Sequence, residues 1–269
     1  MKLTNEQIDF YHQEGYLLIP NSFDPAEVEV LKAQLPIVYA EDTPSRVFEE
    51  GTNVVRAVHG SHKSNQLFGR LVRHPKLLVP AMQLLDNQVY VHQFKVNAKA
   101  AFDGKVWEWH QDYIFWKEED GMSTPRALNA TVFLDDVNEF NGPILVIPRT
   151  HKIGVHESED KDITLQDEQP EWMSHLSANL KYSLEQQTIA RYVHQYGIVG
   201  PKGAAGSVLF FHPNLFHGSG PNMSPLDRAL AMVTYNNVEN KLLDVENPRP
   251  WFLASRDFTP VEVLPSGAL

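Results

Sequence analysis

The sequence predicts a mainly β protein with flanking helices, folded as a double-stranded β-helix of the jelly-roll or cupin-like type. Short apolar or alternating segments recur between turn residues from about residue 88 to residue 238, as in an antiparallel barrel. The preceding residues show helical spacing and helix caps instead. Several prolines after residue 238 preclude a regular helix in the tail. We therefore expect one domain over residues 1–269, with a helical N-terminal support (1–86), a barrel core (about 88–238) and a C-terminal tail (239–269).

The N-terminal support begins with two capped helices. Thr4-Asn-Glu-Gln7 matches a capping box, and Gly15 ends the helix that follows. Asp24-Pro-Ala-Glu27 supplies a cap, a proline at the first helical position and a capping glutamate for the second helix. Between them, Tyr16-Leu-Leu-Ile19 is typical of a short buried strand. Residues 41–66 are polar and irregular, and a loop of this length usually either forms a lid that covers a site or is disordered.

The barrel core contains a strand with a polar face. Over residues 88–97, alternation places Gln93, Lys95 and Asn97 on one face. A polar inward face is unfavourable unless it meets a ligand or partners, so this face indicates a pocket. The charged stretch between residues 148 and 200 is predicted to hold one helix, over Leu184–Tyr192. The other segments with strand character are Ala127–Leu134, Ile144–Ile147, Val208–Phe211 and Ala229–Val238.

Composition excludes several classes of function. The 269 residues contain no cysteine, so disulfides, thiolate metal sites and cysteine nucleophiles are absent. A net charge of −11 disfavours binding to a nucleic-acid backbone, which needs a basic face. The polar N-terminus lacks a signal core, and no apolar run is long enough to span a bilayer. We expect a soluble cytoplasmic protein, monomeric or homodimeric, whose partner is a small molecule rather than nucleic acid or membrane.

His110-Gln111-Asp112 is the segment that most clearly suggests chemistry. In an extended strand, residues i and i+2 project from the same face, so this imidazole and carboxylate can reach a common ion. His217, in a late apolar segment, is the best candidate for an additional histidine. Together the three would form the 2-His-1-carboxylate set that holds non-haem Fe(II) with open coordination positions. The tripeptide is common by chance, but here aromatic residues would form a dry wall around it: Trp107, Trp109, Tyr113, Phe115 and Trp116.

Arg228 is the candidate anchor for a second ligand of such an iron. Three protein ligands leave about three positions, which suit a chelating 2-oxo acid and dioxygen. Arg228 opens the strand after His217, so hairpin pairing could bring its planar guanidinium to the acid's distal carboxylate. A surface salt bridge to Asp227 or another acid is the alternative explanation.

Taken together, these motifs resemble the phytanoyl-CoA dioxygenase superfamily, over nearly the whole chain. Within it, the chain looks most similar to the bacterial free L-proline trans-4-hydroxylases and is also related to the ectoine hydroxylases. The segments that carry the resemblance are Val91–Lys99, Trp109–Trp116, Glu119–Met122, Asn141–Pro143 and His217–Gly220 with Arg228. Arg56–His62 and Met223–Pro225 also match the proline enzymes.

The resemblance implies an Fe(II)- and 2-oxoglutarate-dependent dioxygenase that uses O2 and releases succinate and CO2. Carried over by position, His110, Asp112 and His217 are the metal ligands and the catalytic centre. Arg228 and Ser219 hold the 2-oxoglutarate carboxylate. The other positions implied are Asn97, Trp107 and Asn129 along the co-substrate, and Gln93 beside it or beside the substrate. A carboxylate at position 112 favours hydroxylation over halogenation, because related halogenases have a small residue there.

A free amino acid needs a cation for its carboxylate. Arg56, in the predicted lid, is the first candidate for this role, and Arg126 is the next. Trp116 is the candidate for a wall that packs against the substrate ring, and His59 for a polar contact from the lid. An ordinary solvated arginine is the alternative explanation for Arg56.

The expected activity is hydroxylation of a free small cyclic amino acid, with L-proline at C4, giving trans-4-hydroxyproline, as the first substrate. The same chemistry on ectoine, pipecolate or another small amino acid is one alternative. A non-catalytic barrel that binds a metal or small molecule is another, which the loss of a ligand or of Arg228 would favour; the sequence retains all four. A zinc hydrolase is disfavoured, because the chain has no His-Glu-x-x-His motif.

Overall fold

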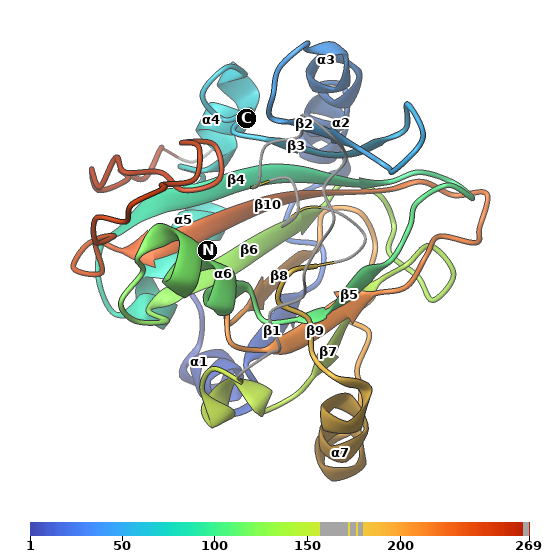
Figure 1. Cartoon of the computed structure of the whole chain (residues 1–269). Helices are drawn as coiled ribbons and strands as arrows, with labels where there is room; N and C mark the ends of the chain where they lie inside the picture. The colour runs from blue at the N-terminus through green and yellow to red at the C-terminus, as the bar shows by residue number, and fades with distance from the viewer. Residues whose placement is uncertain (157–171, 173–175, 177–179, 266–268) are drawn as a thin grey trace.

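Two antiparallel sheets form the framework of the protein, as the computed structural model shows over residues 1–156, 172, 176, 180–265 and 269 (Figure 1). The larger sheet has the strand order β1-β8-β6-β10-β4-β3-β2. Its strands are β1 (Tyr16–Ile19), β2 (Arg46–Phe48), β3 (Val55–His59), β4 (Val89–Lys99), β6 (Ala127–Phe133), β8 (Val208–Phe211) and β10 (Arg228–Asn237). The smaller sheet has the order β5-β9-β7, from β5 (Trp107–His110), β9 (Phe216–Ser219) and β7 (Ile144–Ile147). This architecture confirms the predicted jelly roll.

The two faces of the larger sheet differ in chemistry. Residues such as Phe94 and Val233 point outward into the main apolar core. Their neighbours one step along the strands, including Gln93 and Thr234, point to the inner side, where they meet other polar groups. Because successive side chains of a strand alternate between faces, one central sheet supplies both a core and a polar interior. The polar face predicted for residues 88–97 is therefore present.

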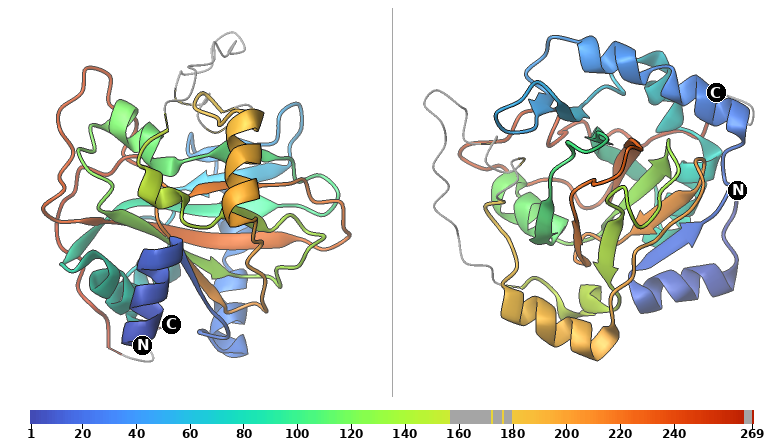
Figure 2. Two further views of the ribbon diagram at one scale, coloured as in Figure 1. Left: turned by 90° about the horizontal axis from the view of Figure 1, so that it is seen from below. Right: turned by 90° about the vertical axis from the view of Figure 1, so that its right-hand side faces the viewer.

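Helices cover the outer face of the larger sheet. Figure 2 shows α1, α2 and α5 on the outside of the barrel, and their apolar residues, such as Leu31 and Leu78, join the main core. α1 begins with the predicted capping box at Thr4 and ends at Gly15, which adopts the left-handed conformation that favours glycine. The helices are α1 (Asn5–Glu14), α2 (Pro25–Lys32), α3 (Leu35–Ala40), α4 (Gln66–Leu71), α5 (Pro75–Leu85), α6 (Asp112–Asp120), α7 (Gln186–Tyr196) and a 3-10 turn, η1 (Thr150–Ile153).

Three expectations from the sequence need correction. Residues 41–66 are not an irregular lid, because they contain β2 and β3, which pair with each other and, through β3, with β4. The N-terminal support contains more strands than expected: the predicted strand Tyr16–Ile19 is present as β1 at one edge of the larger sheet, but β2, at the other edge, was not predicted. The tail was expected to lack a regular helix and to pack along the outside of the barrel; its described part contains no helix, but the side chain of Leu253 is fully buried.

The smaller sheet brings distant segments together. β9 lies between β5 and β7, and the register places His110 opposite His217 across β5 and β9. Both strands face the inner side of the larger sheet, so the polar interior lies between the sheets (Figure 1). Among the described residues, no helix combines the length and the apolar character needed to cross a bilayer.

Candidate active site

The structure brings the three predicted metal ligands together. His110 is the last residue of β5, Asp112 is the first residue of α6, and His217 lies in β9. One ligand atom from each of the three lies within 4.8 Å of the others. His110 Nε2 is 3.5 Å from Asp112 Oδ1, and His217 Nε2 is 3.6 Å from Asp112 Oδ2. His110 and Asp112 therefore meet because a strand ends and a helix begins between them, rather than because both lie on one strand face.

Backbone contacts fix which nitrogen of each histidine is available. His110 Nδ1 lies 2.6 Å from the carbonyl oxygen of Glu108, and His217 Nδ1 lies 2.9 Å from that of Leu215. A carbonyl oxygen only accepts, so each Nδ1 carries the proton and each Nε2 presents its lone pair to the shared centre. Burial, and then the neighbouring His110, lower the pKa of His217 to about 4, which keeps its imidazole neutral near pH 7. Two imidazoles that turn Nε2 towards a shared carboxylate fit a divalent transition metal.

The carboxylate of Asp112 is held from the larger sheet. Asn129 Nδ2 donates to Asp112 Oδ2 at 2.7 Å. Burial opposes ionisation, but the electrostatic interaction with His217, the hydrogen bond to His110 and the charge of Lys95 together hold the pKa of Asp112 below its usual range. Asn129 was expected along the co-substrate. Its hydrogen bond places it next to Asp112, one of the three candidate metal ligands.

The predicted co-substrate residues share one cavity with the histidines. Asn97, Trp107, Ser219 and Arg228 all line it, together with His110 and His217. Arg228 is buried and donates from Nη2 to Asn97 Oδ1 at 3.3 Å. Its Nε and Nη1 have no hydrogen-bond partner among the described residues, nor does the indole nitrogen of Trp107. Buried donors without acceptors are costly, so this end of the cavity fits an anionic, oxygen-rich ligand.

Lys99 is a residue of this site that the sequence analysis missed. It is buried at the end of β4, and its Nζ lies within hydrogen-bond distance of Ser219 Oγ (2.7 Å), the carbonyl oxygen of Lys105 (3.0 Å) and that of Gly220. The ammonium form can donate to all three, and the neutral amine to two of them. Ser219 Oγ in turn donates to the carbonyl oxygen of Gly142 at 2.9 Å. Burial, and then the charge of Arg228, lower the pKa of Lys99 to about 6. Continuing the alternation of Gln93 and Asn97 by one step would have placed Lys99 on the same face.

Lys95 is the second cation of the cavity to which the sequence analysis gave no role. It lines the cavity beside His110, and its Nζ makes no hydrogen bond or ion pair with the described residues. Its closest recorded partner is the ring of Trp107, whose centroid is 5.7 Å from Nζ. Burial lowers the pKa of Lys95, while the charge of Asp112 acts in the opposite direction. Lys95 thus presents a positive charge to the interior without a neutralising contact.

Arg56 was predicted to bind the substrate carboxylate from a lid, with an ordinary solvated arginine as the alternative, and the structure gives it neither a lid position nor exposure to solvent. It lies on β3, is buried, and pairs through Nη1 with Glu49 Oε2 at 2.9 Å. It also donates to the carbonyl oxygens of Leu176 and Val106, at 3.0 and 2.9 Å. Its guanidinium carbon lies 3.7 Å from the centroid of the Trp107 ring. The counter-ion of Arg56 is therefore Glu49 of its own chain, and its guanidinium packs against Trp107, which lines the cavity.

The remaining substrate candidates are dispersed. Arg126 is exposed and pairs with Glu239 at 3.2 Å, so it does not join the site. His59 is buried opposite Lys95 in the β3–β4 register, and neither ring nitrogen has a partner among the described residues. Trp116, on α6, is buried in an apolar cluster next to the site. Gln93 uses its Nε2 to donate to the carbonyl oxygen of Leu253, at 2.9 Å.

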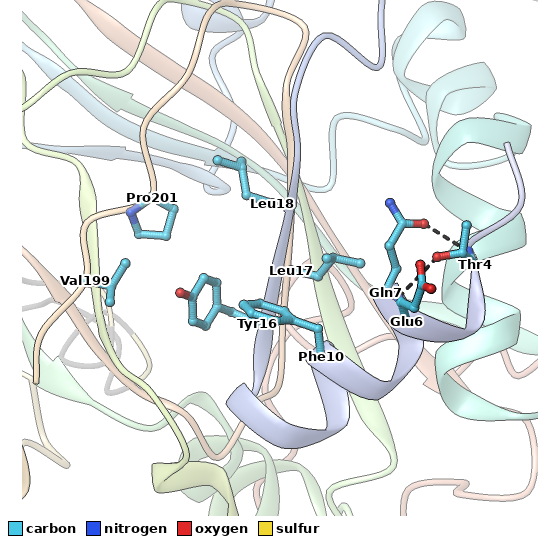
Figure 3. A pocket seen from close by; sticks show the side chains of 9 residues that line it. All are labelled: Thr4, Glu6, Gln7, Phe10, Tyr16, Leu17, Leu18, Val199 and Pro201. Atoms are coloured by element: carbon cyan, nitrogen blue, oxygen red, sulfur yellow. Dashed lines mark hydrogen bonds between the residues drawn. The ribbon is translucent and has the colours of Figure 1, made fainter. Parts of the chain in front are cut away.

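A larger hollow of about 730 Å³ lies elsewhere, between α1 and β1 (Figure 3). Phe10, Tyr16, Leu18 and Pro201 give it an apolar lining, and Thr4 and Gln7 stand at its rim, engaged with each other in the helix cap. None of its lining residues belongs to the His-Asp-His set. The chemistry of the chain is concentrated in the smaller cavity between the sheets.

Comparison with known proteins gives consistent matches. The L-proline trans-4-hydroxylase of Streptomyces griseoviridis is 40% identical over 251 residues, covering 93% of this chain and 92% of that protein. The ectoine dioxygenase of Bordetella bronchiseptica is 37% identical over 265 residues, covering 94% and 83%. The crystal structure of EctD from S. alaskensis with 2-oxoglutarate and 5-hydroxyectoine is 31% identical. It matches with a TM-score of 0.83 over 97% of this chain and 87% of that one.

The model of one protein family also matches most of the chain. That family is described as phytanoyl-CoA dioxygenase, and its model covers residues 11–230, from α1 to the start of β10. The matched span contains all three metal-ligand candidates as well as Lys99, Ser219 and Arg228. This chain therefore belongs to the phytanoyl-CoA dioxygenase family.

Proposed function

We propose that the protein is an Fe(II)- and 2-oxoglutarate-dependent hydroxylase of a free small cyclic amino acid, with L-proline as substrate and trans-4-hydroxyproline as product. Dioxygenase chemistry follows from the family. The observation that carries the proposal is the junction, in one cavity, of a His-Asp-His set with a buried arginine that lacks acceptors. A metal ligand set and an anion site in contact are what a chelating 2-oxo acid requires.

The metal would be held by His110 Nε2, His217 Nε2 and one oxygen of Asp112. When bound, Fe(II) supplies the redox chemistry that couples oxidative decarboxylation of 2-oxoglutarate to hydroxylation of a substrate C–H bond. The protein's part is to orient both imidazoles through their Nδ1 contacts, to keep His217 neutral and to keep Asp112 ionised through its neighbours. Side chains held in place by such contacts favour preorganised catalysis.

The distal carboxylate of 2-oxoglutarate would lie between Arg228 and Ser219, with Lys99 behind Ser219. Arg228 offers Nε and Nη1, two donors in the planar fork that matches a carboxylate. Lys99 donates to Ser219 Oγ, so the hydroxyl proton of Ser219 can turn from Gly142 to the ligand. The unpartnered indole nitrogen of Trp107 is a further donor on this wall.

The substrate carboxylate would bind Lys95. Arg56, expected in this role, already has Glu49 as its counter-ion, and Arg126 lies outside the cavity. Lys95 lines the cavity beside His110 and has no competing acceptor among the described residues. His59, opposite Lys95, would supply a neutral polar contact, because burial lowers its pKa well below its usual value. Gln93 and Trp116 would complete the wall.

Ectoine is the competing substrate, since proteins named ectoine dioxygenase match nearly the whole chain. Incubation with Fe(II), 2-oxoglutarate and each of L-proline, L-pipecolate and ectoine distinguishes them, with products identified by mass spectrometry and NMR. We expect trans-4-hydroxyproline formed in step with succinate. If ectoine is turned over faster than L-proline, ectoine is the substrate, and the proposed hydroxylation chemistry is unchanged. No product and no substrate-stimulated succinate from any of them would favour a non-catalytic binding barrel.

A further inference from the structure

A chain of two hydrogen bonds runs from β10 to a metal-ligand candidate. Thr234 Oγ1 donates to Asn129 Oδ1 at 2.7 Å, and Asn129 Nδ2 donates to Asp112 Oδ2 at 2.7 Å. Thr234 and Asn129 are both buried and stand directly opposite each other in the β10–β6 register. The Thr234 hydroxyl makes no other hydrogen bond to a described residue, so its one hydrogen bond serves to orient Asn129.

The direction of the chain follows from the chemistry of its ends. An ionised carboxylate only accepts, so Asp112 requires the amide nitrogen of Asn129, not its oxygen. The amide oxygen then faces Thr234, whose hydroxyl must donate to it. Without that donor, the amide of Asn129 loses the contact that distinguishes its two orientations. In the flipped orientation, its oxygen would face the oxygen of Asp112 and repel it.

The same row of the sheet supports both sides of the metal site. Asn129 is opposite Phe211 in the β6–β8 register, and the Phe211 ring lies 5.0 Å from that of His217. Asn129 thus holds one ligand while Phe211 packs against another. On its other side, Thr234 pairs with Gln93 where the β10–β4 register shifts. Such irregularities re-aim side chains, and they are common next to functional sites.

We propose that Thr234 is a positioning residue for the metal centre, acting through Asn129 on Asp112. The proposal rests on the metal site of the proposed function and assigns a role to a residue that touches neither metal nor substrate. Groups that orient ligating side chains in this way typically alter metal affinity 10- to 100-fold when they are replaced. The alternative is that Thr234 merely fills space in the interior of the barrel.

Thr131 provides a matched control for that alternative. It lies on the same face of β6, two residues from Asn129, and is fully buried. Its hydroxyl has no partner among the described residues. Thr→Val is nearly isosteric, so the same substitution at positions 131 and 234 removes a buried hydroxyl with and without a link to Asp112. Only the substitution at position 234 should weaken metal binding.

The test is the dissociation constant for Co(II), and for Fe(II) under anaerobic conditions, measured with the full-length protein. Thr234→Val should weaken binding by roughly 10- to 100-fold. Thr234→Ser should bind nearly as well as the wild type, because it keeps the donor. Thr131→Val should bind like the wild type. In an Asn129→Ala background, Thr234→Val should have little further effect, because the link is already cut.

The outcomes separate this inference from the function on which it rests. If the wild-type protein binds neither metal, the metal site itself is wrong. If it binds both, and Thr234→Val stays within about twofold of Thr131→Val, then Thr234 only fills space. Thr234→Ala repeats the comparison should Thr234→Val fail to fold, with Thr131→Ala as its control. Weakened binding in both Thr234→Ser and Thr234→Val would also overturn the hydroxyl's role, since serine retains it.

Discussion

Lys99 and Arg228 lie directly opposite one another in the antiparallel pairing of β4 and β10, and both side chains are buried. Neither forms an ion pair with any described residue. Two adjacent buried bases without a counter-charge are unfavourable, because desolvation and mutual repulsion act together. The pair is therefore best explained as a preformed site for an anion.

Replacing Arg228 should impair 2-oxoglutarate binding. Arg228→Ala removes a charge-assisted pair in a buried site, which costs on the order of 2–5 kcal/mol. We expect the dissociation constant for 2-oxoglutarate, measured anaerobically with the metal-loaded protein, to rise at least tenfold. Arg126→Ala, which removes an exposed arginine, is the control and should leave it unchanged. An Arg228→Ala protein that bound 2-oxoglutarate normally would remove Arg228 from the site.

Binding of 2-oxoglutarate should take up a proton at Lys99. With a pKa of about 6, Lys99 is mostly uncharged near pH 7.5 in the free protein. A carboxylate beside it raises that pKa, so the complex binds more protons than the free protein. Affinity should rise as the pH falls from about 8 towards 6, and level off below. Titration calorimetry in two buffers of different ionisation enthalpy measures the uptake. Lys99→Met should abolish it; the same uptake in that variant would place the proton elsewhere.

Lys99 should also shape the pH dependence of stability in the free protein. Its folded pKa lies below the value of 10.5 in an unfolded chain, so the unfolded state binds the extra proton between about pH 6 and pH 10.5. The free energy of unfolding should therefore increase with pH across this window. In Lys99→Met this contribution should vanish, and chemical denaturation at three or four pH values would detect the flatter profile. An unchanged slope would contradict the depressed pKa.

Metal binding should stabilise the folded protein through His217. A ligand at 100 times its dissociation constant adds about 2.7 kcal/mol to the free energy of unfolding. Thermal unfolding with and without Co(II) should show this shift in the wild type, and a chelator should reverse it. His217→Ala should lose the shift, whereas His194→Ala, on the exposed helix α7, should keep it. If His217→Ala retained the full shift, the third ligand would be another residue.

Substitutions of Lys95 and Arg56 should affect different properties, substrate binding in the first case and stability in the second. Lys95→Met should weaken L-proline binding, leave 2-oxoglutarate binding intact and lower the ratio of hydroxyproline to succinate, because the substrate is no longer held at the reacting centre. Lys95→Arg should recover part of that ratio. The opposite result, with coupling intact in Lys95→Met, would return the carboxylate contact to Arg56.

Arg56→Ala should instead act mainly on the fold. It leaves Glu49 buried without its counter-ion, and breaking a buried pair costs about 3–5 kcal/mol. We expect a large loss of stability by chemical denaturation. Arg56→Met with Glu49→Gln should recover much of it, because no charge is then stranded. If Arg56→Ala were as stable as the wild type and lost only L-proline binding, Arg56 would be the substrate clamp after all.

Sequence reasoning was sufficient where one local pattern carried the information. Alternation over residues 88–97 predicted the polar inner face, and the pairing of His110 with Asp112 and a late histidine predicted the ligand cluster. Arg228 at the start of a strand was likewise identifiable, because hairpin pairing follows from chain order. In each case, the residues that matter are set by the period of a strand or by adjacent segments.

Sequence reasoning was insufficient where a side chain's interaction partner comes from a distant segment of the chain. The partners of Lys99 are carbonyl oxygens at Lys105 and Gly220 and the hydroxyl of Ser219, which only the folded barrel brings to one point. Arg56 was misplaced because nothing local shows that Glu49 turns back beside it across the β2–β3 hairpin. Thr234 was overlooked for the same reason, since its one contact is to a different strand.

The position of β10 has a consequence for how the protein is made. In the larger sheet this strand separates β1, β8 and β6 from β4, β3 and β2, and it is the only described strand that joins the two groups. Of the strands that the structure describes, it is also the last to be synthesised, long after β4, its principal partner. A nascent chain released before Arg228 would carry all three candidate metal ligands yet have its main sheet in two halves. Closure of the barrel must therefore await the emergence of residues 228–237 from the ribosome.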